Sequence, residues 1–197
     1  MCMIPTKQKS GFALLMTLVV VTAVVSITLA IIELSIKQLS LTVTARDSEL
    51  AFQAANAGIE CIRYLHRQAS TTFTTPLPTS VPYTCFQRPS DTLVTVANSF
   101  TVTGNGSIRR YRDTITWGPN NDRCSVLEMV LMHVDPSESS DLVVSNLNTA
   151  FPGYPSGQNK RCSPGSLCTI AEVTGFNKPC NAITTAGSVR REVLLEF

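Results

Sequence analysis

The sequence predicts an α+β protein in which a long N-terminal α-helix, half in the membrane and half exported, packs on an antiparallel β-sheet head stabilised by disulfides. Three observations predict this: a 21-residue apolar run from Phe12 to Ile32, six cysteines behind it, and β-like runs separated by turn residues. We expect a leader at residues 1–11, a transmembrane half of the helix at 12–32, an exported amphipathic half at 33–68 and a β-rich head at 69–197.

The overall composition sets only broad limits. The 197 residues suffice for one ordinary domain with an additional element, and 44% of them are hydrophobic. The formal net charge of +2 is too small to indicate nucleic acid as a partner by itself. Past the apolar run the chain is rich in Thr, Ser, Asn, Pro and Gly, which is typical of a loop-rich β domain.

The apolar run has the length of a membrane span, because about 20 helical residues cross the hydrocarbon core. Lys7 and Lys9 precede it, so the positive-inside rule keeps residues 1–11 in the cytoplasm and exports the rest. An ordinary secretory signal has a shorter apolar region followed by small residues at a cleavage site. Here the run is longer and no such site follows it, so the sequence argues against a plain signal peptide. The plainest alternative is a signal-anchored periplasmic domain that does not assemble with anything.

The predicted helix continues beyond the membrane. Between residues 5 and 76 there is no proline, and between residues 11 and 58 there is no glycine. Apolar positions then recur every three or four residues, as expected for one face of a helix: Leu50, Ala54, Ala57, Cys61 and Leu65. We therefore predict one continuous helix from about Phe12 to Gln68.

The cysteines behind the apolar run predict three disulfides in an oxidising compartment. They are Cys61, Cys85, Cys124, Cys162, Cys168 and Cys180. Six cysteines allow 15 pairings, and the sequence favours only the short Cys162–Cys168 loop, where Pro164 and Gly165 can reverse the chain. The alternative is a set of reduced, buried thiols.

The head begins with a Thr/Pro-rich connector at residues 69–84, which we expect to be extended and exposed. The triplet Gly104-Asn105-Gly106 predicts a hairpin between the strands on either side of it. Residues 145–160 are predicted to form a long surface loop. The predicted strands are Thr92–Ala97, Ser99–Thr103, Ser107–Trp117, Ser125–Val134, Leu142–Ser145, Thr169–Thr174 and Ser188–Glu196.

Five arginines could form a basic patch for DNA or for an acidic neighbour: Arg109, Arg110, Arg112, Arg190 and Arg191. The alternative, which we favour, is a solvated sheet face with ion pairs to Asp113, Glu192 or Glu196.

The remaining polar motifs give weak signals. Asp135, Glu138 and Asp141 are possible oxygen ligands for calcium, spaced three residues apart, but the stretch has no glycine at the turn and no further acid nearby, so a solvated loop without metal is the favoured interpretation. His66 and His133 have no metal-ligand or catalytic spacing, so both are expected to be structural. No catalytic or phosphate-binding motif occurs, and we expect neither enzymatic activity nor a cofactor.

The junction Lys9-Ser10-Gly11-Phe12 resembles the leader of type IV prepilins: a short basic leader ending in Gly, then an aromatic residue that opens an apolar helix. The stretch LAFQAANAGIE at residues 50–60 is similar to minor pilins of the PilX type. The resemblance covers roughly the first third of the chain. It implies a pilin-like fold, cleavage between Gly11 and Phe12 by the prepilin peptidase, and methylation of Phe12. It also implies a lipid bilayer, an inner-membrane assembly platform and other pilin subunits as partners.

One position departs from the pattern of major pilins, which carry a glutamate at the fifth residue after cleavage. Here that residue is Met16, and the neighbouring Thr17 offers only a weak dipole. The resemblance then implies a minor pilin or pseudopilin of a type IV pilus or type II secretion filament, at an initiating or tip position. The alternatives are a tip adhesin and a DNA-binding pilin. The expected location is the inner membrane with a cytoplasmic N-terminus and a periplasmic head, and then the pilus or the extracellular space.

Overall fold

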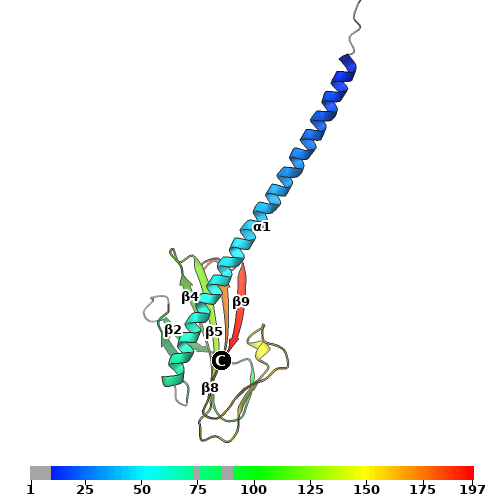
Figure 1. The fold of residues 1–197 in the computed structure, drawn as a ribbon. Coiled ribbons are helices and arrows are strands. Elements are labelled where there is room, and N and C mark those ends of the chain that lie inside the picture. Colours follow the sequence, from blue (N-terminus) through cyan, green and yellow to red (C-terminus); the bar gives the residue numbers. More distant parts are fainter. Residues whose placement is uncertain (1–9, 73–75, 86–90) are drawn as a thin grey trace, which may run out of the picture. The chain divides into compact units, whose positions relative to one another are not determined.

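The computed structural model describes residues 10–72, 76–85 and 91–197, and it contains one long helix and two antiparallel sheets (Figure 1). The helix α1 spans Ser10–Thr72. The larger sheet has the order β1-β2-β4-β5-β8-β9, and the smaller one has the order β3-β6-β7. Their strands are β1 (Ser80–Tyr83), β2 (Asp91–Val96), β3 (Thr101–Thr103), β4 (Ser107–Trp117), β5 (Arg123–His133), β6 (Leu142–Ser145), β7 (Lys160–Cys162), β8 (Leu167–Phe176) and β9 (Arg190–Glu196), and a short 3₁₀ helix, η1, spans Leu147–Thr149. The predicted fold class is confirmed.

The chain divides into two compact units, one ending at Arg46 and the other running from Asp47 to Phe197. In the first unit every residue from 12 to 46 is exposed, including the whole apolar run. By length and composition this helix could cross a membrane.

In the second unit, α1 covers one face of the larger sheet. Its buried positions follow the helical period and are mostly small: Ala51, Ala54, Ala55, Gly58, Ile59, Ile62 and Leu65. The predicted buried face differs slightly from the observed one, because Leu50 and Ala57, which were predicted to be part of it, are only half-buried. Side chains from the helix and from the facing strands share one hydrophobic core, which includes Tyr111, Leu127 and Val173.

Two glycines allow α1 to lie very close to the sheet. A Cβ atom on Gly175 of β8 would come within 2.2 Å of the backbone oxygen of Ala51 and the backbone nitrogen of Ala55. A Cβ on Gly58 would come within 2.6 Å of a Val173 methyl carbon. The run of small residues on the helix therefore serves close helix–sheet packing.

The opposite face of the larger sheet carries a second core. It contains Val130, Met132 and Ile170 from the sheet, together with Phe151 and Tyr154 from the segment that follows β6. The prediction of a surface loop at residues 145–160 is therefore incomplete, because Leu147, Phe151 and Tyr154 are buried in it. The sequence also gave no signal for β7, whose three residues pair with β6.

The predicted hairpin at Gly104-Asn105-Gly106 is wrong. β3 pairs with β6 in the smaller sheet, while β4 is bonded to β2 on one side and to β5 on the other. Because both edges of β4 are occupied, the glycine turn carries the chain from one sheet into the other. Gly104 has φ +96°, and a Cβ there would lie 2.3 Å from the backbone oxygen of Asp141.

The connector is also more ordered than predicted. The helix extends to Thr72, residues 73–75 lie outside the described part, and β1 pairs with β2. Leu77, Val81 and Tyr83 are buried. The Tyr111 hydroxyl donates to the Pro78 carbonyl at 2.6 Å, so the connector is attached to the head rather than free.

All six head cysteines form disulfides: Cys61–Cys85, Cys124–Cys180 and Cys162–Cys168. The favoured local bridge, Cys162–Cys168, is confirmed. The Cys61–Cys85 bridge attaches α1 to the segment after β1, with the two Cα atoms 5.8 Å apart. The Cys124–Cys180 bridge ties the start of β5 to the chain between β8 and β9.

Candidate functional site

The residues predicted for processing lie at the start of α1. The helix begins at Ser10, so Gly11 and Phe12 are in its first turn, and the Phe12 side chain is exposed. Lys7 and Lys9 of the predicted leader lie outside the described residues.

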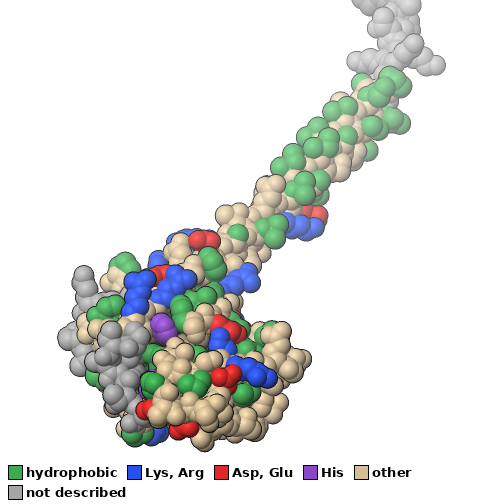
Figure 2. Space-filling view, turned by 60° about the horizontal axis from the view of Figure 1, so that its bottom comes forward, with side chains coloured by type: hydrophobic (Ala, Val, Ile, Leu, Met, Phe, Trp, Pro, Cys, Tyr) green, Lys and Arg blue, Asp and Glu red, His purple; other side chains and the backbone are tan. Residues whose placement is uncertain are grey.

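The apolar half of α1 has no buried side, yet its hydroxyl groups are already satisfied. Thr17 donates to the Leu14 carbonyl and Thr22 to the Val19 carbonyl, each at 2.9 Å. Ser26, Thr28 and Ser35 make the same kind of bond with the preceding turn. Because these hydroxyls bond the backbone of their own helix, they can enter lipid without a polar partner. Figure 2 shows hydrophobic side chains along the visible side of this segment, with charged ones only toward its later turns.

Met16 is half exposed on this apolar surface. No acidic or basic residue occurs from Phe12 to Ile32, and the first charges are Glu33 and Lys37. The segment therefore offers only apolar contact and no buried ion pair to a neighbouring helix. Since Thr17 bonds its own backbone, it adds no free polar group beside Met16.

The structure does not bring the five arginines together. Arg109, Arg110 and Arg112 lie on β4, whereas Arg190 and Arg191 lie on β9, with β5 and β8 between the two strands. Through the paired registers Arg190 is level with Thr116, at the far end of β4 from Arg109. Arg190 pairs with Glu192 at 3.5 Å, and Arg191 donates to Ser48 on α1.

Arg110 has a structural role. Its guanidinium is largely buried and pairs with Glu128 on β5. It also donates to the Ser99 hydroxyl at 3.1 Å and to the carbonyls of Ala97 and Ala150. Arg110 thus joins the larger sheet to the chain before β3 and to the segment after η1. Arg109 donates to the Leu77 carbonyl at 2.8 Å.

The acidic segment 135–141 lies beside an open hollow lined by Pro76, Gly106, Ser107, Asp135, Ser137 and Glu138. Asp135 accepts bonds from the backbone and hydroxyl of Ser137, and these bonds lower the pKa of its carboxyl group. Glu138 accepts a bond from the Asn105 amide. Among the described residues no three His, Cys, Asp or Glu side chains gather in a way that could hold a metal ion.

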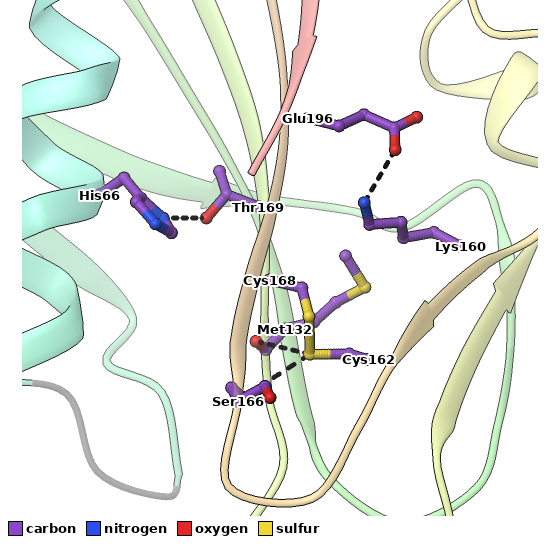
Figure 3. Close-up of a disulfide and its surroundings, with 8 residues drawn as sticks. All are labelled: His66, Met132, Lys160, Cys162, Ser166, Cys168, Thr169 and Glu196. Carbon is purple, nitrogen blue, oxygen red and sulfur yellow. Dashed lines mark hydrogen bonds and ion pairs between the residues drawn. A yellow bond between two sulfur atoms is a disulfide. The ribbon is translucent and has the colours of Figure 1, made fainter.

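Both histidines lie in the second unit, which runs from Asp47 to Phe197. His66 of α1 shares a 2.8 Å hydrogen bond with the buried Thr169 hydroxyl of β8 (Figure 3). Its ring also stacks on Phe197, with the ring centroids 5.0 Å apart. Burial lowers the pKa of His66. These contacts attach the end of the helix to β8 and to the C-terminal residue, as expected for a structural histidine. His133 ends β5 and is half-buried.

Sequence reasoning missed one residue, Glu172 on β8. It is buried and lies directly opposite Glu128 of β5, and its Oε2 atom has no hydrogen-bond partner. Burial raises its pKa, and the neighbouring charges of Glu192 and Glu128 raise it further, while a backbone bond from Gly153 and the nearby Arg110 act against them. The signal that could have revealed it is a lone acid in the otherwise uncharged run LCTIAEVTGF.

Comparison with known proteins identifies no relative. No family model, no curated protein and no solved structure matches the chain.

Proposed function

We propose that this protein is a minor pilin or pseudopilin that enters a filament of the type IV pilus or type II secretion kind. The observation that carries the proposal is the division of α1. One half is apolar and exposed all round, and its continuation is buried in a disulfide-linked β head. A subunit that moves from a bilayer into a filament needs this combination, because its helix must be covered first by lipid and then by other helices.

The apolar half is suited to both environments. Its backbone bonds lie within the helix and its hydroxyls bond the preceding turn, so it loses no polar contact when lipid is replaced by neighbouring helices. In water, by contrast, the exposed side chains from Phe12 to Ile32 would form an apolar surface far larger than soluble monomers expose. The segment must therefore be surrounded by lipid in the membrane and by neighbouring helices in the filament.

Met16 supports a terminal position in the filament. A buried amino terminus needs an opposite charge, and Met16 cannot supply one to a neighbouring subunit. A subunit at the tip has no neighbour above it that would need the charge. The proposed role is therefore to initiate or cap the filament rather than to repeat along it.

The first test is the mature N-terminus. Mass spectrometry of the protein purified from membranes should find cleavage after Gly11 and a methyl group on Phe12. The substitution Gly11→Val should leave the full-length precursor, because it changes the residue at the cut, while the matched variant Ser10→Ala should be processed normally. Intact wild-type Met1, or a cut at any other bond, contradicts the proposal and supports a signal-anchored domain.

The second test separates assembly from binding. Deletion of the gene should strongly reduce filament number, and the wild-type gene should restore it. Normal filaments with lost surface adhesion or DNA uptake would instead support a tip adhesin or a DNA-binding pilin. The separation of the arginines on β4 from those on β9 argues against the DNA-binding alternative.

A further inference from the structure

The larger sheet has two free edges, and one of them is blocked. The edge strand β1 has only four residues, and Pro82 is the third. The backbone N–H of Thr95 donates to the Thr79 carbonyl, so the backbone groups of Thr79 face β2. Because successive residues of a strand direct their N–H and C=O groups to opposite sides, those of Ser80 and Pro82 point away from β2, to the outer edge. Proline has no N–H, so this edge cannot offer a regular ladder to another strand.

The other edge, β9, has no such block. It has seven residues and contains no proline. Thr169 of β8 and Phe197 exchange both backbone hydrogen bonds, at 3.1 and 2.9 Å, so the odd-numbered residues of β9 face β8. The even-numbered residues direct their N–H and C=O groups to the free edge: Arg190, Glu192, Leu194 and Glu196. No strand in the described part of the chain pairs with that edge.

We propose that the free edge of β9 binds β9 of a second copy of this chain, in an antiparallel pair centred on Val193. In that register Arg190 lies opposite Glu196 of the other copy, and Glu192 lies opposite Leu194. Every outward-facing residue then meets an outward-facing residue, so the backbone groups of both edges pair.

The charges of β9 select this register. Arg190 lies at one end of the strand and Glu196 at the other, so an antiparallel copy places opposite charges together. Within one chain Arg190 pairs with Glu192 at 3.5 Å and Glu196 pairs with Lys160 at 2.8 Å, so the contact between copies extends these two ion pairs. The nearest alternative registers shift one strand by two residues, because only such shifts keep outward-facing residues opposite each other. Each of them places Glu192 opposite a glutamate of the other copy. Like charges directly opposite each other destabilise a strand pair. The half-buried side chains of Val193 and Leu195 are covered by the second copy.

This contact is separate from the proposed filament assembly. Antiparallel pairing reverses one head relative to the other, whereas subunits of one filament share a direction. The pairing does not depend on the proposed function, so either proposal can fail while the other stands.

The register gives a direct test by disulfide cross-linking of the full chain in detergent, in a Cys2→Ser background. Val193 lies opposite itself in a non-hydrogen-bonded pair, where Cα atoms are about 4.5 Å apart, within the range of a disulfide. Val193→Cys should therefore form an intermolecular disulfide under mild oxidation, about tenfold more than the matched variant Leu195→Cys, which lies opposite Arg191 and far from its own copy. Equal cross-linking of the two variants, or none with Val193→Cys, overturns the proposal.

Two further substitutions test the backbone and the charges. Adding Leu194→Pro removes an outward N–H that takes no part in bonding to β8, so the cross-linked fraction should fall about tenfold with the head still folded. Leu194→Ala is the control, and Glu192→Pro repeats the test if Leu194→Pro fails to fold. Arg190→Glu should also reduce cross-linking, and adding Glu196→Arg should restore it. Proline variants that fold and cross-link as well as Leu194→Ala would contradict the pairing.

Discussion

The two halves of α1 have the same secondary structure but opposite surroundings. From Phe12 to Ile32 every side chain is exposed, and bulky aliphatic residues occupy all sides of the helix. From Asp47 onward the helix has one buried face, and Ala and Gly make its closest contacts with the sheet. The first half can be surrounded by any apolar environment, whereas the buried face of the second half is shaped to contact its own sheet.

This difference reflects two ways of stabilising a helix. A helix in lipid needs internal hydrogen bonds and apolar side chains, and their exact shapes matter little. A helix against a sheet is stabilised by close contact, and here the contact is so close that Gly175 leaves no room for a Cβ atom. Substitutions should therefore have different effects in the two halves.

The largest expected effect concerns the bridge that attaches the second half of α1 to the head. Replacing Cys61 and Cys85 together by Ser opens a loop with a sequence separation of 24. The free energy of unfolding of the head should fall by about 3.5 kcal/mol, because the unfolded chain gains entropy. Urea unfolding in detergent, followed by Trp117 fluorescence, measures the change. Cys2→Ser is the control, and equal unfolding midpoints for the control and the double variant would contradict the prediction.

A charge should matter mainly in the first half. Val21→Arg places a guanidinium near the middle of the apolar run and should cost about 3 kcal/mol of insertion free energy. Phe52→Arg changes an exposed residue of the second half and should leave insertion unchanged. Protease protection of the head in membrane vesicles measures the inserted fraction. An equal loss of protection in both variants would show that the two halves do not differ in this way.

Added volume should matter mainly in the second half. Ala54 is fully buried and its carbonyl accepts a 2.6 Å bond from the Ser125 hydroxyl. Ala54→Leu should lower the free energy of unfolding of the head by about 2 kcal/mol through overpacking. Ala23→Leu, in the exposed half, should leave it unchanged. The same urea experiment measures both variants, and a wild-type midpoint for Ala54→Leu would refute the close packing.

The smallest expected effect is a dependence on pH that only the head can show, since the run from Phe12 to Ile32 has no titratable side chain. Glu172 faces Glu128, Glu192 and Arg110, and its pKa is raised in the folded protein. Folding therefore favours its protonated form, so its stabilising contribution is complete below the pKa of the unfolded chain and is lost as pH rises through the folded pKa.

Glu172→Gln keeps this position neutral at every pH. The variant should be about 1 kcal/mol more stable than the wild type at pH 8, and the difference should shrink as the pH falls toward 4. Urea unfolding across this range measures the difference. Glu138→Gln, in the exposed acidic segment, is the control. A difference that does not change with pH would exclude titration of Glu172 as its cause.

Much of the architecture was predictable because its signals are local. β4 and β6 have the predicted bounds, and the other strands expected from alternating apolar residues differ by only a few residues at their ends. The helix was identified by the absence of Pro and by the spacing of its apolar residues. The hairpin prediction failed because a glycine turn indicates that the chain reverses, but it does not indicate which strand the next segment pairs with.

The candidate site was predictable only in part. The basic patch required knowledge of which strands are neighbours, and the sheet order separates Arg110 from Arg190. Glu172 was missed because its surroundings include Gly153, which bonds it from a segment expected to be a surface loop.

The sequence alone determined the length and apolarity of the first half of α1, the number of cysteines that follow it and the alternation of the strands, because each depends on residues close together in the chain. The tertiary structure decided the pairing of Cys61 with Cys85 and of Cys124 with Cys180, the division into two sheets and the free edge of β9. These features depend on which distant segments become neighbours. That choice is made by packing, in which the small residues of α1 and Gly175 allow one close fit between helix and sheet.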